Sequence, residues 1–370
     1  MNKIDKIKLA SSYLFVHLSQ QWVLMSGLGS CKPSLVCALV NWQCNFKCYF
    51  CFHPYYGKRE ILSLEDWQRI LSQLRSWLGT FRMNFLGGEP FLRNDFIDIL
   101  AHARKLGIMS GITTNASLIT EEIAKELSKL DLFSVGISID GIKAETHEYA
   151  RGCPGMFDKA MAGIANLKKY CKPDMKIVIR TIIMEKNIDE IIPIVNWIKD
   201  WGLTGVIIQP LDYAPILNPV PPPGETLPVD FEKWIKTYSE NQVKDLNKID
   251  ILCDELIAMK KEGAPILNEP GALEIIKEYF HNPTIRIAQK CQAGVQNFMI
   301  VPNGDVHTCV NTVAFEPIGN LKTASPKEIW TSEKAKKTRE DIRKCERTCL
   351  FFSHAKRSLI DKAKMFIRYI

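Results

Sequence analysis

Short apolar runs alternate with longer amphipathic segments along the first two thirds of the chain. The apolar runs predict six strands, at residues 34–40, 82–85, 110–113, 133–139, 176–184 and 205–209. The amphipathic segments carry apolar residues at helical spacing and predict five helices between these strands, at residues 64–78, 95–106, 120–130, 157–170 and 189–201. This alternation is typical of right-handed βα units around a parallel sheet. We therefore expect an α/β fold whose ligands gather at the carboxyl ends of the strands.

The pattern changes after the sixth predicted strand. Residues 218–228 contain five prolines and a glycine, which disfavour both helix and sheet ladder and indicate a linker or a loop at the edge of the site. Residues 231–263 are predicted to be mostly helical, and residues 271–280 form a further short helix. The Asn303-Gly304 pair lies at the centre of an apolar segment and predicts a β-hairpin over residues 298–309.

Three cysteines, Cys44, Cys48 and Cys51, fall within eight residues at the spacing C-x3-C-x2-C. Three thiolates so spaced can hold three corners of one iron–sulfur cubane. Closed ferredoxin-type clusters use four cysteines, so a triplet leaves one iron with an open position, and an open position is the usual mark of a catalytic metal site. The alternatives are a structural zinc knuckle and buried cysteines without a ligand.

A second set of cysteines lies in the last 80 residues of the chain. The predicted hairpin should return Cys309 towards Cys291, and Cys345 and Cys349 share one face of a helical turn. Four thiolates are enough for a fully ligated cubane. A tetrahedral zinc site with four cysteines is the alternative.

The N-terminal triplet resembles the signature of the radical S-adenosylmethionine (radical SAM) superfamily. That resemblance implies a partial (β/α)6 barrel and a 4Fe–4S cluster whose open iron chelates SAM. It also implies an enzyme that cleaves SAM reductively and abstracts a hydrogen atom with the 5′-deoxyadenosyl radical. By the same resemblance, Phe50 lies beside the adenine of SAM.

Further residues match the superfamily in the expected order along the chain. By resemblance, Gly87, Gly88 and Glu89 form the segment that receives the SAM ammonium group. The remaining matches are Asn115 and Ser138 at the ribose or carboxylate of SAM, Arg151 at its carboxylate, and Gln209 in the adenine pocket.

The C-terminal cysteines resemble the Twitch module, a shorter relative of the seven-cysteine SPASM extension. This implies a second, auxiliary 4Fe–4S cluster held by Cys291, Cys309, Cys345 and Cys349 in a small domain with a β-hairpin and helices. The predicted organisation is an N-terminal extension (1–33), a radical SAM core (34–215), a proline-rich linker with a helical segment (216–285), an auxiliary-cluster module (286–352) and a basic amphipathic C-terminal helix (353–370).

Composition and charge limit the partners and the compartment. The net charge of +7 is spread along the chain and forms no aromatic-interleaved stripe, so we expect no nucleic-acid partner. Exposed cluster thiolates need a reducing compartment, which predicts a cytoplasmic protein. Residues 4–25 and 353–370 combine apolar residues at helical spacing with basic ones, a pattern of peripheral membrane helices and of ordinary core-packing helices alike.

The resulting prediction is a radical SAM enzyme acting on a small molecule, a lipid-linked intermediate or a peptide, with a flavodoxin- or ferredoxin-type electron donor. The run from Cys44 to His53 also resembles the cluster loop of viperin-type enzymes, which modify nucleotides, although the second cysteine set argues against that alternative. An iron–sulfur electron carrier or binding protein is the non-enzymatic alternative.

Overall fold

The computed structural model describes residues 3–26, 31–51, 53, 59–212, 231–284, 291–309 and 316–345, and the side chains of these residues except 3–14 and 231. Its centre is one sheet of nine strands in the order β6-β5-β4-β3-β2-β1-β7-β8-β9. The strands are β1 (Leu35–Leu39), β2 (Arg82–Leu86), β3 (Met109–Thr114), β4 (Ser134–Ser138), β5 (Lys176–Ile183), β6 (Gly205–Pro210), β7 (Asn297–Ile300), β8 (Asp305–His307) and β9 (Gly319–Asn320).

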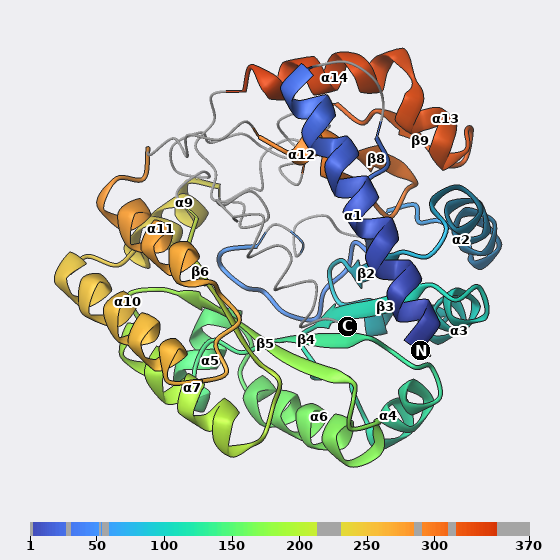
Figure 1. Ribbon diagram of the computed structural model, residues 1–370. Coiled ribbons are helices and arrows are strands. Elements are labelled where there is room, and N and C mark those ends of the chain that lie inside the picture. Colours follow the sequence, from blue (N-terminus) through green and yellow to red (C-terminus); the bar gives the residue numbers. More distant parts are fainter. Residues whose placement is uncertain are drawn as a thin grey trace.

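Strands β1 to β6 are parallel neighbours and curve into the partial barrel that the alternating pattern predicts. Helices cover the outside of this barrel (Figure 1). The helices of this half are α2 (Leu64–Leu78), α3 (Phe96–Lys105), α4 (Glu121–Ser128), α5 (Ala144–Arg151), α6 (Met156–Tyr170) and α7 (Ile191–Asp200), with short 3-10 turns η2 (Pro90–Leu92) and η3 (Ile188–Glu190). All six predicted strands and five predicted helices are confirmed, and α5 is an addition.

Helix α2 illustrates how local sequence sets these elements. Ser63 and Asp66 form a capping box, with Asp66 N donating to Ser63 Oγ at 3.1 Å and Ser63 N donating to Asp66 Oδ2 at 3.2 Å. The apolar face of the helix, including Trp67 and Ile70, is buried against the sheet. Gly79 ends the helix with a positive φ of 78°.

The two faces of the barrel strands differ in burial. In β5 the residues Ile177, Ile179, Thr181 and Ile183 are buried under the helices, while the alternate residues Lys176, Val178, Arg180 and Ile182 are half-buried on the inner face. The carboxyl ends of the parallel strands therefore form one rim, with an inner surface leading to it.

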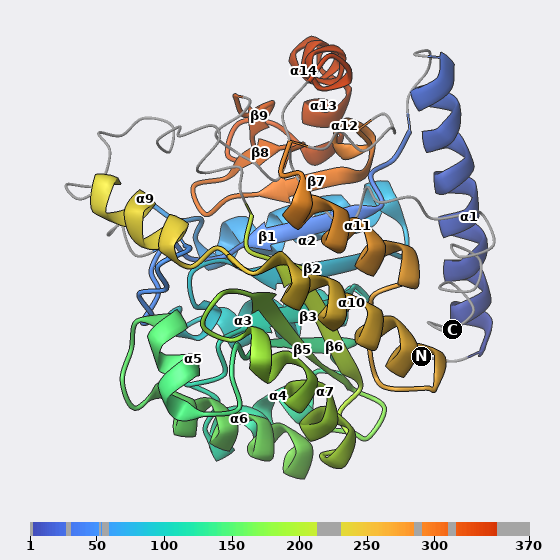
Figure 2. The same ribbon diagram turned by 90° about the vertical axis from the view of Figure 1, so that its left-hand side faces the viewer.

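The C-terminal part extends the same sheet. Strand β7 pairs parallel with β1, and β8 and β9 follow antiparallel, which confirms the hairpin predicted at Asn303-Gly304. Figure 2 shows β7, β8 and β9 above β1, with α12 (Ala293–Gln296), α13 (Pro326–Thr331) and α14 (Glu333–Arg343) over them. The remaining helices are α1 (Lys3–Ser26), α9 (Phe231–Glu240), α10 (Leu246–Lys261) and α11 (Pro270–His281).

The fold class is thus α/β, a partial barrel of six parallel strands followed by a small unit with a hairpin and helices. The domain boundaries given above stay predictions. The proline-rich segment at 218–228 and the terminal segment at 353–370 lie outside the described residues. In the part of the chain that is described, no helix is both long and apolar enough to cross a bilayer.

Candidate active site at the carboxyl ends of the barrel strands

The cluster loop, residues 43–51, follows the carboxyl end of β1. Its fold is fixed by Phe46, whose side chain is buried, and by Cys51 N donating to Cys48 O at 3.1 Å. Burial is the main cause that raises the pKa of Cys44 and of Cys51 to about 12, and the neighbouring Cys48 raises both further. The three thiols therefore lie close enough to repel one another as thiolates, which is the arrangement that a cationic cluster would stabilise.

Within the described residues, no three histidine, cysteine or carboxylate side chains converge where they could share one metal ion. A cubane binds each of its cysteines through a different iron, so its ligands need not meet at one point. The arrangement of the described thiols is therefore compatible with a cubane at the cluster loop.

The two consecutive glycines at the end of β2 hold the start of the cluster loop. A Cβ on Gly88 would stand 1.9 Å from Gln43 O, and one on Gly87 would stand 2.7 Å from Asn41 O. In place of side chains, Gly88 N donates to Asn41 O at 3.0 Å and Glu89 N donates to Gln43 O at 2.8 Å. The glycines thus bring two backbones together directly before Cys44.

Glu89 is fully buried beside this contact. Its carboxylate accepts from Thr114 Oγ1 at 2.8 Å, Asn115 N at 2.9 Å and Phe91 N at 3.2 Å. Burial raises the pKa of Glu89 to about 7, although these donors act in the opposite direction. A carboxylate offers about four acceptor positions, so one remains for a cationic group such as an ammonium.

Asn115, at the end of β3, joins the neighbouring strand to the cluster loop. Its Nδ2 donates to Asn45 Oδ1 at 2.8 Å, and its Oδ1 accepts from Ser117 N at 3.0 Å and Ser117 Oγ at 2.7 Å. Asn45 in turn donates to Ser117 Oγ at 2.9 Å. Neither Asn45 nor Ser117 was identified from the sequence as part of the site.

Arg151, the last residue of α5, reaches the cluster loop from the opposite side. Its Nη2 forms an ion pair with Asp140 Oδ2 at 2.6 Å, and its Nη1 lies 3.8 Å from Cys48 Sγ. Its guanidinium carbon stands 5.2 Å from the centre of the Phe50 ring. Burial lowers the pKa of Arg151, but Asp140 and Cys48 outweigh it and the pKa is raised, so the side chain is a fixed cation.

The backbone after Arg151 also packs on the cluster loop. Lys47 N donates to Arg151 O at 3.1 Å, and a Cβ on Gly152 would stand 2.3 Å from Lys47 O. The thiol of Cys153 donates to Asn45 O at 3.3 Å. Ser138 and Gln209 lie half-buried at the ends of β4 and β6, on the same rim.

The second cysteine set is partly described. Burial raises the pKa of Cys291, and Cys345 lies near enough to contribute in the same direction. Cys309 follows β8 and is half-buried, as is Cys345, while Cys349 lies outside the described residues.

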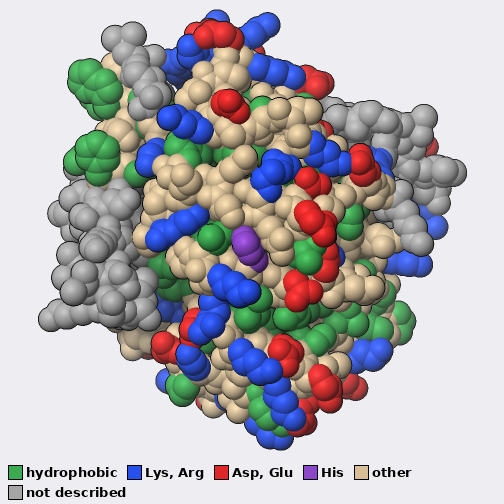
Figure 3. Space-filling view, turned by 90° about the vertical axis from the view of Figure 1, so that its right-hand side faces the viewer, with side chains coloured by type: hydrophobic (Ala, Val, Ile, Leu, Met, Phe, Trp, Pro, Cys, Tyr) green, Lys and Arg blue, Asp and Glu red, His purple; other side chains and the backbone are tan. Residues whose placement is uncertain are grey.

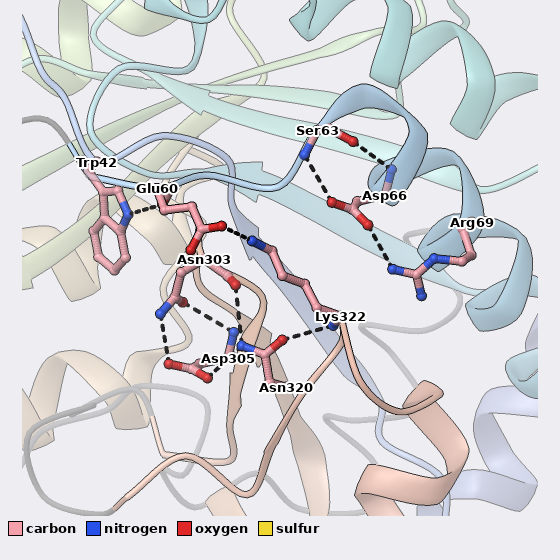
Figure 4. A network of polar contacts seen from close by, with 9 residues as sticks. All are labelled: Trp42, Glu60, Ser63, Asp66, Arg69, Asn303, Asp305, Asn320 and Lys322. Atoms are coloured by element: carbon pink, nitrogen blue, oxygen red, sulfur yellow. Dashed lines mark hydrogen bonds and ion pairs between the residues drawn. The ribbon is translucent and has the colours of Figure 1, made fainter.

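A polar network joins this second region to the segment that follows the cluster loop (Figure 4). Lys322 forms an ion pair with Glu60, whose carbonyl accepts from Trp42 Nε1 at 3.1 Å. On the hairpin side, Asn320 Nδ2 donates to Asp305 Oδ1 at 2.9 Å and Asn320 Oδ1 accepts from Lys322 N at 2.8 Å. Close by, Leu62 N donates to Pro302 O at 2.7 Å, so the hairpin is attached directly to the chain between the two regions.

Family models match both regions. The radical SAM superfamily model matches residues 43–198, which include the cluster loop and most of the barrel. The SPASM model, an iron–sulfur cluster-binding domain, matches residues 291–350. The chain therefore contains a radical SAM domain and an iron–sulfur cluster-binding domain of the SPASM type. Such a pair of domains is that of radical SAM enzymes and carries two 4Fe–4S clusters and a SAM site.

The named relatives and solved structures match this chain either over part of their length or at low sequence identity. The chain is 33% identical to the Fe-coproporphyrin III synthase of Methanosarcina barkeri over 188 residues, 50% of this chain but only 45% of that protein. It is 24% identical to the AdoMet-dependent heme synthase of the same organism over 306 residues, 79% of this chain and 81% of that protein. The structure of Streptococcus suis SuiB bound to the precursor peptide SuiA is similar in fold, with a TM-score of 0.63 at 19% identity over 83% of this chain and 66% of that one.

Most of the candidate residues lie at one place, the rim formed by the carboxyl ends of the barrel strands. Phe50, Glu89, Asn115 and Arg151 lie within contact of the cluster loop or of one another, and Gly87 and Gly88 act through their backbone. Asp140, the ion-pair partner of Arg151, was not predicted from the sequence. The role of each residue towards SAM or a cluster stays a proposal.

Proposed function

We propose that this chain cleaves SAM reductively and uses the resulting radical to abstract a hydrogen atom from a biosynthetic substrate. The observation that supports this most is that Cys44, Cys48 and Cys51 lie in one short loop, beside the buried Glu89, at the carboxyl rim of a parallel barrel. A 4Fe–4S cluster at these cysteines would supply one electron to the SAM sulfonium, whose C5′–S bond then breaks to give methionine and a 5′-deoxyadenosyl radical.

The chain's own residues bind and orient SAM in this proposal. Glu89 accepts the SAM ammonium group as a charge-assisted hydrogen bond, because its buried carboxylate keeps one acceptor position. Asn115, Ser138 and Arg151 contact the ribose or the carboxylate, while Phe50 and Gln209 contact the adenine. Transfer of a hydrogen atom to the radical yields 5′-deoxyadenosine and leaves a substrate radical.

The second region would hold a 4Fe–4S cluster through Cys291, Cys309, Cys345 and Cys349. These cysteines follow the barrel in sequence, and a cluster held by all four would have every iron position ligated by protein. Its proposed task is to accept an electron from the substrate radical or to anchor the substrate, and not to bind SAM.

The proposed substrate is a small biosynthetic intermediate, lipid-linked or free, or a peptide. Two observations support different members of this set: the relatives above are named for Fe-coproporphyrin and heme synthesis, and SuiB was crystallised with a precursor peptide. The match to the SPASM model over residues 291–350 argues against a viperin-like nucleotide substrate. The S-adenosylmethionine-dependent nucleotide dehydratase of Selenomonas ruminantium, 29% identical over 216 residues, supports that alternative, which therefore stays open. The radical SAM match favours an enzyme over an electron carrier.

The electron is proposed to come from a flavodoxin- or ferredoxin-type donor in a reducing, cytoplasmic compartment, where exposed thiolates persist. A groove of about 610 Å³ opens beside the start of the cluster loop and is lined by Gln43, Asn41 and the segments 61–65 and 92–95. Its position next to Cys44 makes it the proposed approach for such a donor.

The test is SAM cleavage by anaerobically reconstituted, dithionite-reduced protein, followed as 5′-deoxyadenosine. Wild type should form it, and Cys48→Ala should form none. Cys171→Ala is the matched control, because this half-buried thiol lies on the outer side of the barrel and donates to Ala124 O. Cluster-loaded wild type that binds SAM and never releases 5′-deoxyadenosine would contradict the proposal.

A further inference from the structure

Among the residues that the structure describes, helix α1 contacts the body of the protein through one side. Gln20 on that side is fully buried, and its Nε2 donates to Lys32 O at 2.8 Å and to Val295 O at 3.1 Å. Val23 and Leu24 pack there with Cys31 and Val295 as a small separate core. The helix is therefore held in a defined rotation, with a buried amide that fixes which side faces outwards.

The outward side of the same helix is apolar. The side chains of Phe15, Leu18, Trp22 and Met25 are 74%, 55%, 64% and 78% exposed. They recur every three or four residues and so form one continuous line, the α1 stripe. Figure 3 shows hydrophobic side chains protruding at the upper left of the molecule, on the side where α1 lies, with Lys and Arg side chains beside them.

A helix with apolar residues on both sides is normally covered on both sides, and contiguous exposed apolar patches mark interaction sites. The indole of Trp22 is amphipathic and prefers the boundary between hydrocarbon and water, and Phe and Leu are typical of the apolar face of helices that lie at this boundary. An apolar medium with a polar boundary is thus a suitable partner for the α1 stripe.

Basic residues lie at both ends of the stripe. Lys3, Lys6 and Lys8 precede it on the same helix. Beyond its other end, α14 packs on α12, which packs on α1, and Lys334, Lys336 and Lys337 are exposed on α14. Basic residues next to an exposed apolar helix face are typical of surfaces that bind anionic lipids.

We propose that the α1 stripe inserts into the headgroup boundary of a membrane that contains anionic phospholipid, with α1 lying in the membrane plane. The proposal does not depend on SAM chemistry. It would place the catalytic domain at the membrane surface without a spanning helix.

The experiment is flotation of the full-length protein with vesicles of phosphatidylcholine, with and without phosphatidylglycerol. Wild type should float with the anionic vesicles and less so at high salt, which screens the basic residues. The double variant Phe15→Ser/Trp22→Ser should bind at least about tenfold more weakly, because two large side chains no longer bury apolar surface. Ile251→Ser, at an equally exposed apolar residue on α10 (66%), should bind as wild type does.

A second readout locates the contact. Among the described residues, Trp22 is the one exposed tryptophan, and the others are buried or half-buried. Brominated lipid should therefore quench the tryptophan emission of wild type, and Trp22→Phe should lose that quenching. Absence of flotation, or flotation that the double variant retains, would overturn the proposal. So would a dimer that the double variant converts to a monomer in light scattering without lipid, because the stripe would then bind a second copy of the chain.

The contacts of Arg151 carry an independent inference, which rests on the cluster of the proposed function. Arg151 is 8% exposed, and its guanidinium lies 3.8 Å from Cys48 Sγ and is held there by Asp140. A cation that donates to a ligand sulfur stabilises the more negative, reduced form of a cluster. The geometry points to Arg151 as a positioning residue that raises the reduction potential of the SAM-binding cluster.

Redox titration followed by EPR, on cluster-loaded protein without SAM, tests this. Arg151→Met should lower the midpoint potential, Arg151→Lys should lower it less, and Asp140→Asn should raise it because the cation is then uncompensated. An unchanged midpoint in Arg151→Met, together with weaker SAM binding, would overturn the inference and assign the side chain to SAM alone. Failure of wild type to load the cluster at all would instead count against the proposed function.

Discussion

The two cysteine regions of this protein are built in different ways. Cys44, Cys48 and Cys51 belong to one short loop, which is held by the ends of β2 and β3 and by the end of α5. Cys291, Cys309 and Cys345 stand in separate segments, before α12, after β8 and after α14, and Cys349 lies outside the described residues. The first site is thus encoded by local spacing and the second by tertiary structure. The comparison also predicts unequal functions, with an open iron only at the first site.

The largest effect that sharpens this comparison is on iron content. Reconstituted wild type should hold about eight irons, and replacement of Cys44, Cys48 and Cys51 by alanine should leave about four, those of the second cluster. Iron and sulfide analysis with EPR checks this. Stoichiometric zinc in anaerobically purified protein, without a second cluster, would contradict the assignment of a 4Fe–4S cluster to the second cysteine set.

The next effect concerns Glu89, which belongs to the first site only. Its pKa is raised from 4.5 to about 7, so between these values the folded, SAM-free protein holds a proton that the unfolded chain releases. The free energy of unfolding should therefore fall by about 3 kcal/mol as the pH rises through this interval. Chemical denaturation at several pH values measures the fall, and Glu89→Gln should flatten it.

SAM should oppose that effect, because its ammonium group favours the ionised carboxylate. SAM affinity should increase as the pH rises towards about 7 in wild type and change less in Glu89→Gln. Equal pH dependence in the two proteins would show that Glu89 does not meet the ammonium.

A smaller effect is expected at the backbone contact that holds the cluster loop. Gly88→Ala should cost about 1–3 kcal/mol, because the new Cβ would meet Gln43 O at 1.9 Å, and should reduce iron at the first cluster alone. Gly271→Ala, where a Cβ would meet nothing within 4 Å, is the matched control. Thermal unfolding and iron content together separate a displaced loop from a generally weakened fold.

These positions show how much of the structure could be predicted from the sequence. The strands and helices of the barrel were predictable because apolar residues recur within each of them at strand or helix spacing. The hairpin was predictable from Asn303-Gly304. The close approach at Gly88 and the pairing of Asp140 with Arg151 were not, because both depend on segments that only the folded sheet brings together. Helix α5 was missed as well, since it is short and largely polar.

The smallest expected effect is at the network between the two regions. Asn320→Ala removes the bonds to Asp305 Oδ1 and from Lys322 N and should cost about 1–2 kcal/mol. Lys322→Ala should cost less than about 1 kcal/mol, because its partner Glu60 is exposed. Denaturation midpoints of both variants measure this, and a larger loss in Lys322→Ala would mean that the ion pair between the regions stabilises the protein more than the hydrogen bonds within the hairpin do.

The central claim is that only the first site handles SAM, and parallel SAM cleavage by two variants tests it most directly. After circular dichroism has shown that both are folded, each is reduced and incubated with SAM. Cys309→Ala/Cys345→Ala should still form 5′-deoxyadenosine, and the variant without Cys44, Cys48 and Cys51 should form none. Cleavage that survives loss of the first set, or that disappears with loss of the second in a folded protein, would contradict this account.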